Sequence, residues 1–496
     1  MNQPVSKSRR VDAVVSNVFG LQQLRPGQRA VIDSVLARRH TLAIMPTGAG
    51  KSLCYQVPAL LMSGMTLVVS PLIALMRDQY EKMTALDLAA VQINSAVPLQ
   101  EARRAKSRIG RRAVEFVFTT PEQLLSPELT QVLSRARVDL VVIDEAHCIS
   151  QWGHDFRPAY VEALHSIRAF RDATVLALTA TAPPEVLEDI QAQLGLGPLS
   201  IVNTGVHRPN LRYAVRQVES DTDKQRQLID ILRHLEGAGI VYAASVRHVE
   251  AIARLLKAEG IDAVSYHGRM PVKARSAAQD AFMSGRIDTV VATNAFGMGI
   301  DRADIRAVVH YDLPASLDVY YQESGRAGRD GRPSDCLLLF QRRDRALQSF
   351  FLAGRYPTRD DVVAVGAALR QLPSGATITT SELRTVVTTV AASKMRVILN
   401  LLKESGAIRE RRGARVESTA RLATMDLESL AAGYDERRNR ERGKLEQMTV
   451  YGQTALCRTR LLLEALGDEN AEAACDHCDN CCGAAERAVG IAEGVA

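Results

Sequence analysis

The sequence is poor in the features that mark a membrane or secreted protein. No apolar run approaches the roughly 20 residues that a membrane-spanning helix needs, because Ser63 and Gly64 interrupt the candidate at 57–69. The first residues, MNQPVSKSRR, lack the apolar centre of a secretion signal. We therefore expect a cytoplasmic protein with no membrane partner.

Neither sign of charge dominates, and cysteine is scarce over most of the chain. Lysine and arginine total 62 against 56 acidic residues, and the net charge of +6 permits a polyanionic partner without requiring one. Most of the eight cysteines lie near the C-terminal end, at positions 457, 475, 478, 481 and 482. Cytoplasmic thiols stay reduced, so this cluster favours a bound metal over disulfides.

Short β-rich runs alternate with helical stretches over the first 350 residues. A first series of predicted buried strands comprises 41–45, 66–70, 114–118, 138–143 and 174–178, and a second comprises 239–242, 263–266, 289–292, 307–311 and 336–340. Strands separated by helices predict right-handed βαβ units on parallel sheets. The two series therefore predict two α/β lobes with a boundary at 203–210.

The most informative segment follows the predicted strand 138–143. Asp144 and Glu145 lie at the strand end, where Asp144 can hold the Mg²⁺ of a nucleoside triphosphate and Glu145 can polarise a water. The single tryptophan of the chain, Trp152, follows closely, and three residues suited to base contact come after it: His154, Phe156 and Arg157. Rings beside a cation suit stacking on unpaired bases. One loop thus combines nucleotide chemistry with base contact, as a motor on nucleic acid requires.

A phosphate-binding motif follows the first predicted strand. Its residues are Met45, Pro46, Thr47, Gly48, Ala49, Gly50, Lys51 and Ser52. The glycines let backbone N–H groups wrap phosphates at a helix N-terminus. Lys51 would reach the β- and γ-phosphates of ATP, and Ser52 together with Asp144 would ligate Mg²⁺.

The segment 144–158 resembles the DEAH box and the aromatic-rich loop of the RecQ family of DNA helicases. Further motifs in the same order extend this resemblance over about residues 15 to 345. It implies two tandem RecA-like lobes. Leu24-Arg25-Pro26-Gly27-Gln28 resembles the family motif in which glutamine recognises adenine, although the chain has leucine at 21 and 24 where the family usually has aromatics. A solvated Gln28 at a helix start is the alternative.

Residues 320–331 resemble motif VI of these helicases. The resemblance implies that Arg329 is an arginine finger, that Arg326 is its partner and that Gln322 lines the ATP cleft. A guanidinium that reaches the γ-phosphate only when the lobes close would make hydrolysis depend on lobe position. Taken alone, two arginines in a glycine-rich loop would more often be solvated surface.

Other matches imply a nucleic-acid track and its coupling to ATP. Ser70 in 70–75 and Thr120 in 119–122 lie in segments that resemble backbone-binding motifs, where hydroxyls hold phosphates without reading sequence. Residues 179–182, 266–268 and 295–301 resemble further motifs. We expect Trp152 and Phe156 to couple base contact to hydrolysis and His147 to relay between Glu145 and their loop. A plain core role is the alternative for Trp152.

Residues 357–420 no longer show the alternation of strands and helices seen in the first 350 residues. Helical stretches at 358–372, 380–387 and 393–406 precede a predicted hairpin, 408–417, that turns at Gly413. This is the order of a winged helix, in which Lys394, Arg396 and the hairpin arginines could face DNA. A winged helix that binds protein, or a spacer, would have the same pattern.

Four of the clustered cysteines have the spacing of a structural zinc site. Cys457 is followed at a distance by Cys475, Cys478 and Cys481, and soft thiolates in a tetrahedron suit Zn²⁺. Cys482 could replace Cys481. The pattern resembles the RecQ zinc domain, but in typical members that domain directly follows the motor, whereas here the winged-helix-like segment comes first.

The sequence thus predicts an ATP- and Mg²⁺-dependent DNA helicase, 3′→5′ by resemblance, acting in repair or recombination. We expect RecA-like lobes at 1–205 and 206–350, a winged-helix-like domain at 351–425, a helical zinc-binding domain at 426–484 and a tail at 485–496. DNA is the expected partner, and a monomer is the simplest expectation for the assembly. An RNA helicase, a translocase that does not unwind, and a DNA-binding regulator with an inactive motor are the alternatives.

Overall fold

The computed structural model describes residues 7–150, 156–181, 183–297, 302–373, 375–411, 415–468 and 474–482. The N-terminal lobe, lobe 1, is built on a sheet of order β3-β4-β2-β5-β6-β1-β7 in which every pair is parallel. Its strands are β1 Thr41–Ile44, β2 Met65–Val69, β3 Ala90–Ile93, β4 Phe116–Thr119, β5 Val138–Ile143, β6 Thr174–Thr179 and β7 Ser200–Asn203.

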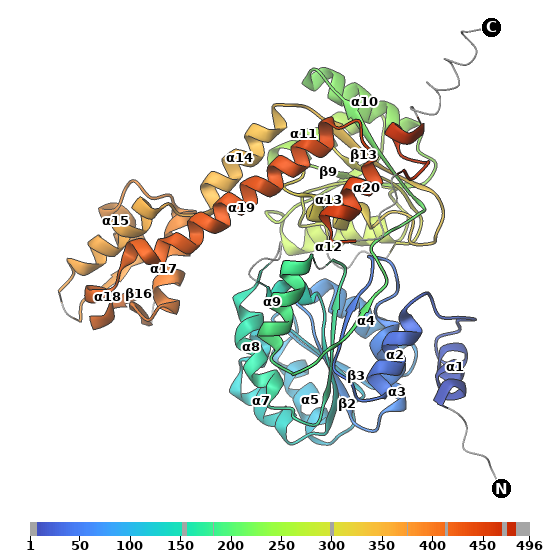
Figure 1. The fold of residues 1–496 in the computed structure, drawn as a ribbon, viewed down its shortest axis with the longest axis horizontal. Coiled ribbons are helices and arrows are strands. Elements are labelled where there is room, and N and C mark those ends of the chain that lie inside the picture. Colours follow the sequence, from blue (N-terminus) through green and yellow to red (C-terminus); the bar gives the residue numbers. More distant parts are fainter. Residues whose placement is uncertain are drawn as a thin grey trace.

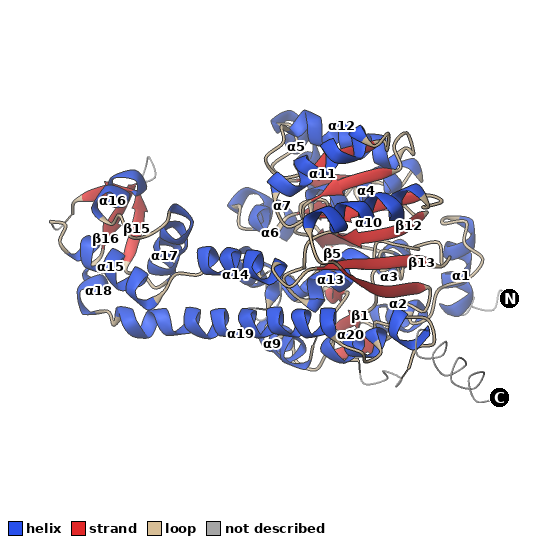
Figure 2. Ribbon diagram, turned by 90° about the horizontal axis from the view of Figure 1, so that it is seen from above, coloured by secondary structure: helices blue, strands red, loops and turns tan. Residues whose placement is uncertain are grey.

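The helices of lobe 1 lie on both faces of this sheet (Figures 1 and 2). They are α1 Lys7–Asn17, α2 Gln28–Leu36, α3 Leu53–Leu61, α4 Ile73–Ala85, α5 Leu99–Gly110, α6 Pro121–Leu124, α7 Pro127–Ser134, α8 Pro158–Arg168 and α9 Pro184–Leu194, with a 3₁₀ turn, η1, at Ala146–Ile149. The central strands β5 and β6 are buried along their whole length. Side chains of successive strand residues alternate between the faces, so apolar residues at most positions fill both cores.

The second lobe, lobe 2, repeats the plan with a parallel sheet of order β10-β11-β9-β12-β13-β8. Its strands are β8 Leu211–Gln217, β9 Ala238–Tyr242, β10 Ala263–Tyr266, β11 Thr289–Ala292, β12 Ile305–His310 and β13 Ser334–Phe340, and its helices are α10 Asp221–Arg233, α11 Val246–Ala258, α12 Val272–Met283 and α13 Leu317–Ser324. The chain passes from one sheet to the other between Asn203 and Leu211. The predicted fold class, two parallel-sheet lobes, is confirmed.

All ten strands expected from the sequence are present, with ends shifted by a few residues. The strands that the sequence pattern did not reveal are β3, β7, β8 and β14, and each lies at an edge of its sheet. An edge strand has solvent on one side and needs no continuous apolar run. In β7, for example, intermediate and exposed residues alternate.

The C-terminal region contains a winged-helix-like module joined to lobe 2 by two adjacent helices, α14 Asp344–Arg355 and α19 Leu427–Gln453 (Figures 1 and 2). The module comprises α15 Arg359–Arg370, β14 Thr377–Thr379, α16 Thr380–Val386, α17 Ala392–Glu404, β15 Ile408–Arg411, β16 Arg415–Ser418 and α18 Ala420–Thr424. The three predicted helices and the hairpin strands are therefore present, and β14 adds a third strand. The turn at Gly413 lies outside the described residues.

Helix α19 is 27 residues long and enters two separate cores. Leu427 and Ala431, near its start, belong to the core of the winged-helix-like module. Leu445, Met448 and Tyr451, near its end, belong to a core that includes buried residues of lobe 2, where the ring centroids of Tyr451 and Tyr320 lie 5.3 Å apart. Phe340 packs so closely on the last turns that a Cβ at Gly452 would lie 2.3 Å from its ring, which excludes a larger residue there. Helix α20, Arg458–Ala465, follows.

Candidate ATP site, nucleic-acid track and metal centre

The phosphate-binding loop connects β1 to α3 in lobe 1. Gly48 and Gly50 have φ of +84° and +76°, in the left-handed region that glycine adopts without strain. A Cβ at Gly50 would also lie 2.7 Å from the Gln28 side chain, so the loop is closed tightly over α2. Ser52 immediately precedes α3, so the loop ends at a helix N-terminus, where backbone N–H groups favour bound anions.

The two acids lie at the carboxyl end of β5, beside this loop. Burial and the neighbouring Glu145 raise the pKa of Asp144 to about 7, while Lys51 and a hydrogen bond from Ser70 Oγ at 3.2 Å oppose the rise. Glu145 has φ of +51°, a strained conformation for a side chain of this size, and such strain is often found at functional sites. A divalent cation held by Asp144 and Ser52 would favour the ionised carboxylate, so this half-buried acid fits the predicted Mg²⁺ ligand.

Lys51 lies between these acids and lobe 2. Its Nζ donates to the carbonyl oxygens of Met45 and Pro46 at 3.2 and 3.4 Å. Burial lowers the pKa of Lys51, and Arg329 of lobe 2 lowers it further. The negative charges of Glu145 and Asp144 oppose this shift and raise the pKa of Lys51. Arg329 is close enough to the loop that a Cβ at Gly48 would lie 3.4 Å from its Cγ. Groups from both lobes therefore converge on the phosphate-binding loop.

Arg326, the second arginine of motif VI, is held by buried groups of lobe 2. Its guanidinium lies against Gly297, where a Cβ would be 3.0 Å from Nη2. Burial raises the pKa of Tyr242, and Arg326 opposes this as a charge and as a hydrogen-bond partner. The Tyr242 hydroxyl donates to Phe296 O at 2.6 Å. Tyr242 thus connects Arg326 to the loop after β11. Gln322 lines the cavity beside Arg326.

Sequence reasoning missed Arg208, which joins the two lobes directly. Its guanidinium donates to Thr47 O in the phosphate-binding loop at 2.6 Å, and to Ala327 O and Gly328 O of motif VI at 3.0 and 2.9 Å. Because these acceptors are backbone carbonyls, no side-chain pattern in the sequence identifies them. The only available signal was the position of Arg208 in the connection between the two sheets.

The predicted adenine-recognition residues contact the loop itself. Gln28 is buried; its amide donates to Ala49 O and Gly50 O at 3.0 and 2.9 Å, and its Oε1 accepts from Arg25 N at 2.7 Å. The Arg25 guanidinium donates to Gly48 O. A solvated Gln28, the alternative considered from the sequence, is therefore wrong.

His147 links the DEAH segment to the next motif. Its Nδ1 lies 3.3 Å from Glu145 Oε2 and 3.2 Å from Thr179 Oγ1, and Thr179 donates to Thr181 O at 2.8 Å. The sequence did not single out Thr179 as the partner of His147. This chain of contacts leads from Glu145 to Thr181, shortly before α9.

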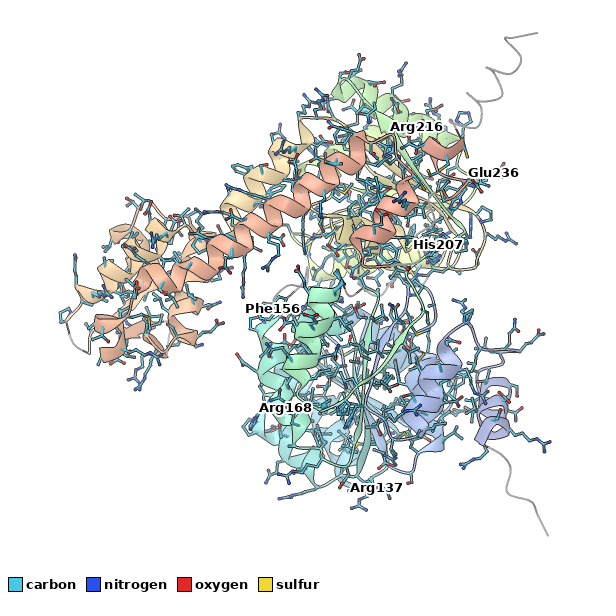
Figure 3. All side chains as sticks on the ribbon, viewed as in Figure 1. Arg137, Phe156, Arg168, His207, Arg216 and Glu236 are labelled. Carbon is cyan, nitrogen blue, oxygen red and sulfur yellow. The ribbon has the colours of Figure 1, made fainter. Side chains whose placement is uncertain are left out.

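The predicted track residues lie at the carboxyl edge of the lobe 1 sheet. Ser70 is bonded to Asp144, and the Thr120 hydroxyl caps α6 by accepting from Gln123 N at 3.4 Å. Arg157 donates to Pro71 O at 3.1 Å. Phe156 lies on the side of lobe 1 that faces α19, where Arg437 is 5.5 Å above its ring (Figure 3). Trp152 and His154 lie outside the described residues.

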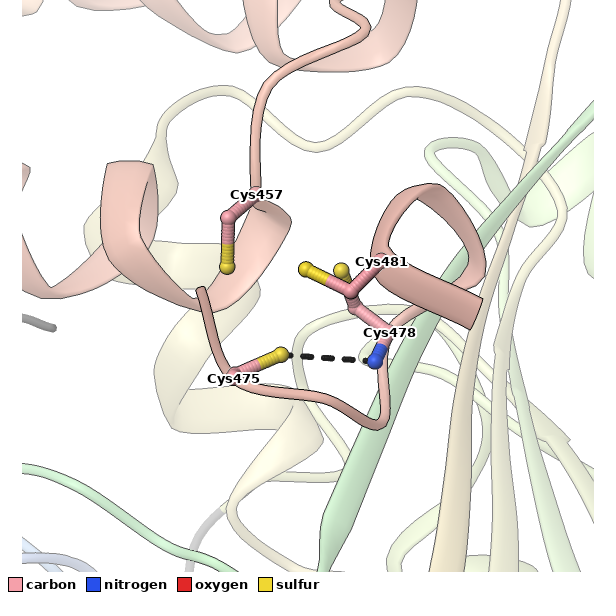
Figure 4. A group of neighbouring side chains, drawn as sticks. All are labelled: Cys457, Cys475, Cys478 and Cys481. Carbon is pink, nitrogen blue, oxygen red and sulfur yellow. Dashed lines mark hydrogen bonds between the residues drawn. The ribbon is translucent and has the colours of Figure 1, made fainter. Parts of the chain in front are cut away.

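The predicted zinc ligands form one cluster. The Sγ atoms of Cys457, Cys475, Cys478 and Cys481 all lie within 4.8 Å of one another (Figure 4). Burial opposes ionisation of Cys475, but hydrogen bonds from Thr459 and from backbone amides lower its pKa to about 6. Cys482 is exposed, outside the cluster, and bonded to Asp476 O. The four thiols fit a structural Zn²⁺ site with Cys481 as the fourth ligand.

Arg458 stabilises the loop that carries two of these cysteines. It is buried and forms an ion pair with Asp479, Nε to Oδ1, at 2.6 Å, while its Nη1 donates to Tyr451 O at 2.6 Å. Asp479 Oδ2 accepts from Val215 N in β8 at 2.8 Å. The cysteine cluster is therefore anchored to the edge of the lobe 2 sheet.

Three family descriptions match the chain. They are DEAD/DEAH box helicase at residues 25–190, helicase conserved C-terminal domain at 223–331 and RecQ zinc-binding at 416–482. The chain is 38% identical over 349 residues to a protein of Bacillus subtilis named "Probable ATP-dependent DNA helicase RecS", with 70% of each chain covered. The chain belongs to the RecQ family. The predicted resemblance is confirmed.

The chain matches only part of the length of two further RecQ relatives. It is 42% identical over 345 residues to the ATP-dependent DNA helicase RecQ of Bacillus subtilis, covering 69% of this chain and 58% of that one. It is 40% identical over 341 residues to the RecQ of Haemophilus influenzae, covering 68% and 55%. The chain thus spans little more than half of these two proteins.

Solved structures resemble this RecQ chain in fold. The helicase Lhr of Mycobacterium smegmatis, bound to single-stranded DNA and AMP-PNP, has a TM-score of 0.57 at 20% identity and covers 89% of this chain and 62% of its own. The helicase MrfA bound to DNA has a TM-score of 0.55 at 20% identity, covering 86% and 62%. Among the described residues no helix is both long and apolar enough to span a membrane.

Proposed function

We propose that this RecQ-family protein is an ATP- and Mg²⁺-dependent DNA helicase that moves 3′→5′ on single-stranded DNA and unwinds duplex or branched DNA in repair or recombination. The observation that supports this most is the meeting of Lys51, Asp144 and Glu145 of lobe 1 with Arg329 of lobe 2 around one phosphate-binding loop. A site divided between two bodies links hydrolysis to their relative movement.

Each part of the site has a proposed role. The loop residues 47–50, Lys51 and Ser52 bind the phosphates and Mg²⁺ with Asp144, while Arg25 and Gln28 recognise the base and Gln322 lines the cleft. Glu145 polarises the attacking water, and Arg329, supported by Arg326, stabilises charge in the transition state. On the strand side we propose Ser70, Thr120, His147, Trp152, His154, Phe156 and Arg157 as contact or coupling residues.

The proposed domains follow the described elements. Lobe 1 is assigned to 1–205, lobe 2 to 206–350, the winged-helix-like domain to 351–425 and the zinc-binding domain to 426–484, followed by the tail at 485–496. The change of sheet between β7 and β8 supports the first boundary. Helix α19 begins at Leu427, beside the boundary between 425 and 426, and contributes to the core of the winged-helix-like module and to that of lobe 2.

The deciding experiment measures ATP hydrolysis and strand separation by wild-type protein with single-stranded DNA, forked DNA with either tail polarity, and RNA. We expect DNA to stimulate hydrolysis and a 3′-tailed fork to be unwound. If RNA stimulates ATP hydrolysis more strongly than DNA and RNA duplexes are unwound, the protein is an RNA helicase. If DNA stimulates hydrolysis but its strands are not separated, the protein is a translocase that does not unwind.

Lys51→Ala tests the phosphate site. We expect ATP turnover to fall by at least about 10³-fold, because the lysine charge that faces the β- and γ-phosphates is lost. The affinity for single-stranded DNA should stay within a few-fold of the wild-type value. Lys106→Ala is the matched control, because Lys106 is also a lobe 1 lysine but pairs with Glu128 on the surface. Turnover unchanged by Lys51→Ala would refute the assignment of the phosphate site. Wild-type protein that binds DNA but shows no DNA-stimulated hydrolysis would instead be a DNA-binding regulator with an inactive motor.

A further inference from the structure

Helix α14 leaves two adjacent aromatic rings in solvent. Phe350 is 73% exposed and Phe351 39% exposed, with ring centroids 6.1 Å apart and ring planes 60° apart. Large aromatic side chains usually gain stability by burial, and exposed apolar patches commonly mark binding sites. One face of α14 is packed against the protein: Gln348 donates to Leu313 O at 2.6 Å and Leu352 is buried, while the exposed Arg345 pairs with Glu446 of α19 at 2.7 Å.

Phe351 also lines a cavity of about 520 Å³ that both lobes form. The walls include Ala244 after β9 and Asn294 and Gly297 after β11, all from loops at the carboxyl edge of the lobe 2 sheet. Lobe 1 contributes Arg157, next to Phe156. The cavity is of a size that accommodates small organic groups, and it combines an exposed ring with a guanidinium and loop backbone.

We propose that Phe351, with Phe350 beside it, is a base-stacking site that binds an unpaired base of a single strand as the strand crosses lobe 2. The inference rests on the proposed function and names a contact within it. A flat base matches an exposed ring, whatever the sequence. Arg157, in the wall of the same cavity as Phe351, supplies positive charge there, which suits a strand with phosphates better than an apolar peptide.

The site has a mechanical consequence. Helix α14 is bound to α19 by Arg345 and Glu446, and α19 enters the core of lobe 2, so the phenylalanines move with lobe 2. Phe156 belongs to lobe 1. Aromatic contacts on separate lobes would let one lobe hold the strand while the other advances.

The first test measures binding of a fluorescent oligothymidylate by anisotropy at several salt concentrations. Phe351→Ala should lower affinity by about 5- to 100-fold, the range for loss of one base stack. Phe351→Tyr should stay within twofold, because it keeps the ring, whereas Phe351→Leu should lose most of the affinity. The dependence of log affinity on log salt should not change, since no phosphate contact is removed.

The second test places one abasic site at successive positions of the strand. For wild type, one position should reduce affinity strongly, and for Phe351→Ala that same position should have no further effect. Phe350→Ala should weaken the effect of the abasic site at that position by a smaller amount. This variant should fold normally, because the Phe350 ring is mostly exposed. Val450→Ala is the control, since Val450 is an exposed apolar residue of α19.

Equal losses on intact and abasic strands, or unchanged affinity in Phe351→Ala, would overturn the stacking site. Concentration-dependent self-association that Phe350→Ala abolishes would also overturn it, because the rings would then serve a second copy of the chain. These outcomes are distinct from failure of the proposed function, in which wild-type protein itself would show no hydrolysis stimulated by DNA.

Discussion

Cationic residues in the cleft between the lobes and cationic residues in the winged-helix-like module are arranged in opposite ways. In the cleft, Lys51 and Arg329 come from different lobes and approach one loop, beside two half-buried acids. In the module, each of several cations pairs with an acid of the same module: Lys394 with Asp361 at 2.8 Å, Lys403 with Glu410 at 2.7 Å and Arg411 with Glu417 at 2.6 Å.

The difference shows that the number of cations does not locate a binding site. Paired surface charges are largely satisfied and contribute about 0–1 kcal/mol each to stability. In the cleft, burial lowers the pKa of Lys51 and Arg329 of the other lobe lowers it further, while burial and the neighbouring Glu145 raise the pKa of Asp144. Perturbed groups in a cleft are the better indicator of chemistry.

The largest expected effect tests the cleft side of this comparison. Arg329→Ala should reduce DNA-stimulated ATP turnover by about 10³-fold, because the guanidinium opposite Lys51 stabilises charge that develops during hydrolysis. The KM for ATP should change by only a few-fold, since the contact matters most in the transition state. Steady-state hydrolysis with saturating single-stranded DNA measures both quantities.

Arg332→Ala is the control for this variant, because Arg332 lies three residues further in the same loop and is exposed. Arg326→Ala provides a second comparison, since Arg326 lies against Gly297 and hydrogen-bonds to Tyr242 rather than approaching Lys51. If Arg326→Ala costs more turnover than Arg329→Ala, the assignment of finger and partner is reversed. If neither matters, the two-lobe site is wrong.

An intermediate effect is expected at the cysteine cluster, where the four side chains would bind a structural zinc ion and take no part in ATP hydrolysis. Cys478→Ser should reduce bound zinc to well below one ion per chain and lower the melting temperature by about 5–10 °C, because a structural metal site stabilises the fold that forms it. Metal analysis of purified protein and thermal unfolding measure the two quantities.

Cys482→Ser is the matched control, since Cys482 lies close in sequence but outside the cluster. It should keep full zinc content and the wild-type melting temperature. Loss of zinc in Cys482→Ser, with retention in Cys481→Ser, would mean that the fourth ligand is Cys482.

Much of this architecture could be predicted from the sequence. Central parallel strands are buried on both faces, so their continuous apolar runs are visible, and the phosphate-binding loop and the DEAH segment combine residue types whose chemistry is specific. The cysteine spacing likewise predicted a cluster that the structure forms. These features are local, so a short stretch of sequence contains each of them.

What escaped prediction depends on partners distant in sequence or on backbone atoms. Arg208 donates hydrogen bonds to backbone carbonyls of both lobes. Tyr242 donates to Phe296 O and hydrogen-bonds with Arg326. Edge strands such as β7 carry polar residues and lack a clear apolar run. The pairing of Lys403 with Glu410, and of Arg411 with Glu417, appeared in the sequence only as a basic hairpin.

The smallest expected effect tests the module. The double variant Lys403→Ala, Arg411→Ala should change single-strand affinity by less than about twofold, because both cations already pair with acids, and should shift the melting temperature by no more than about 2 °C. Lys403 lowers the pKa of Glu410, so any contribution of this pair is present at neutral pH and is lost as the pH falls through that lowered pKa.

Exposed Arg384 and Arg396, for which the structure gives no acidic partner among the described residues, supply the comparison. Should the double variant lose tenfold in affinity while Arg384→Ala and Arg396→Ala do not, DNA would have to displace the pairing acids, and the hairpin would face the strand after all.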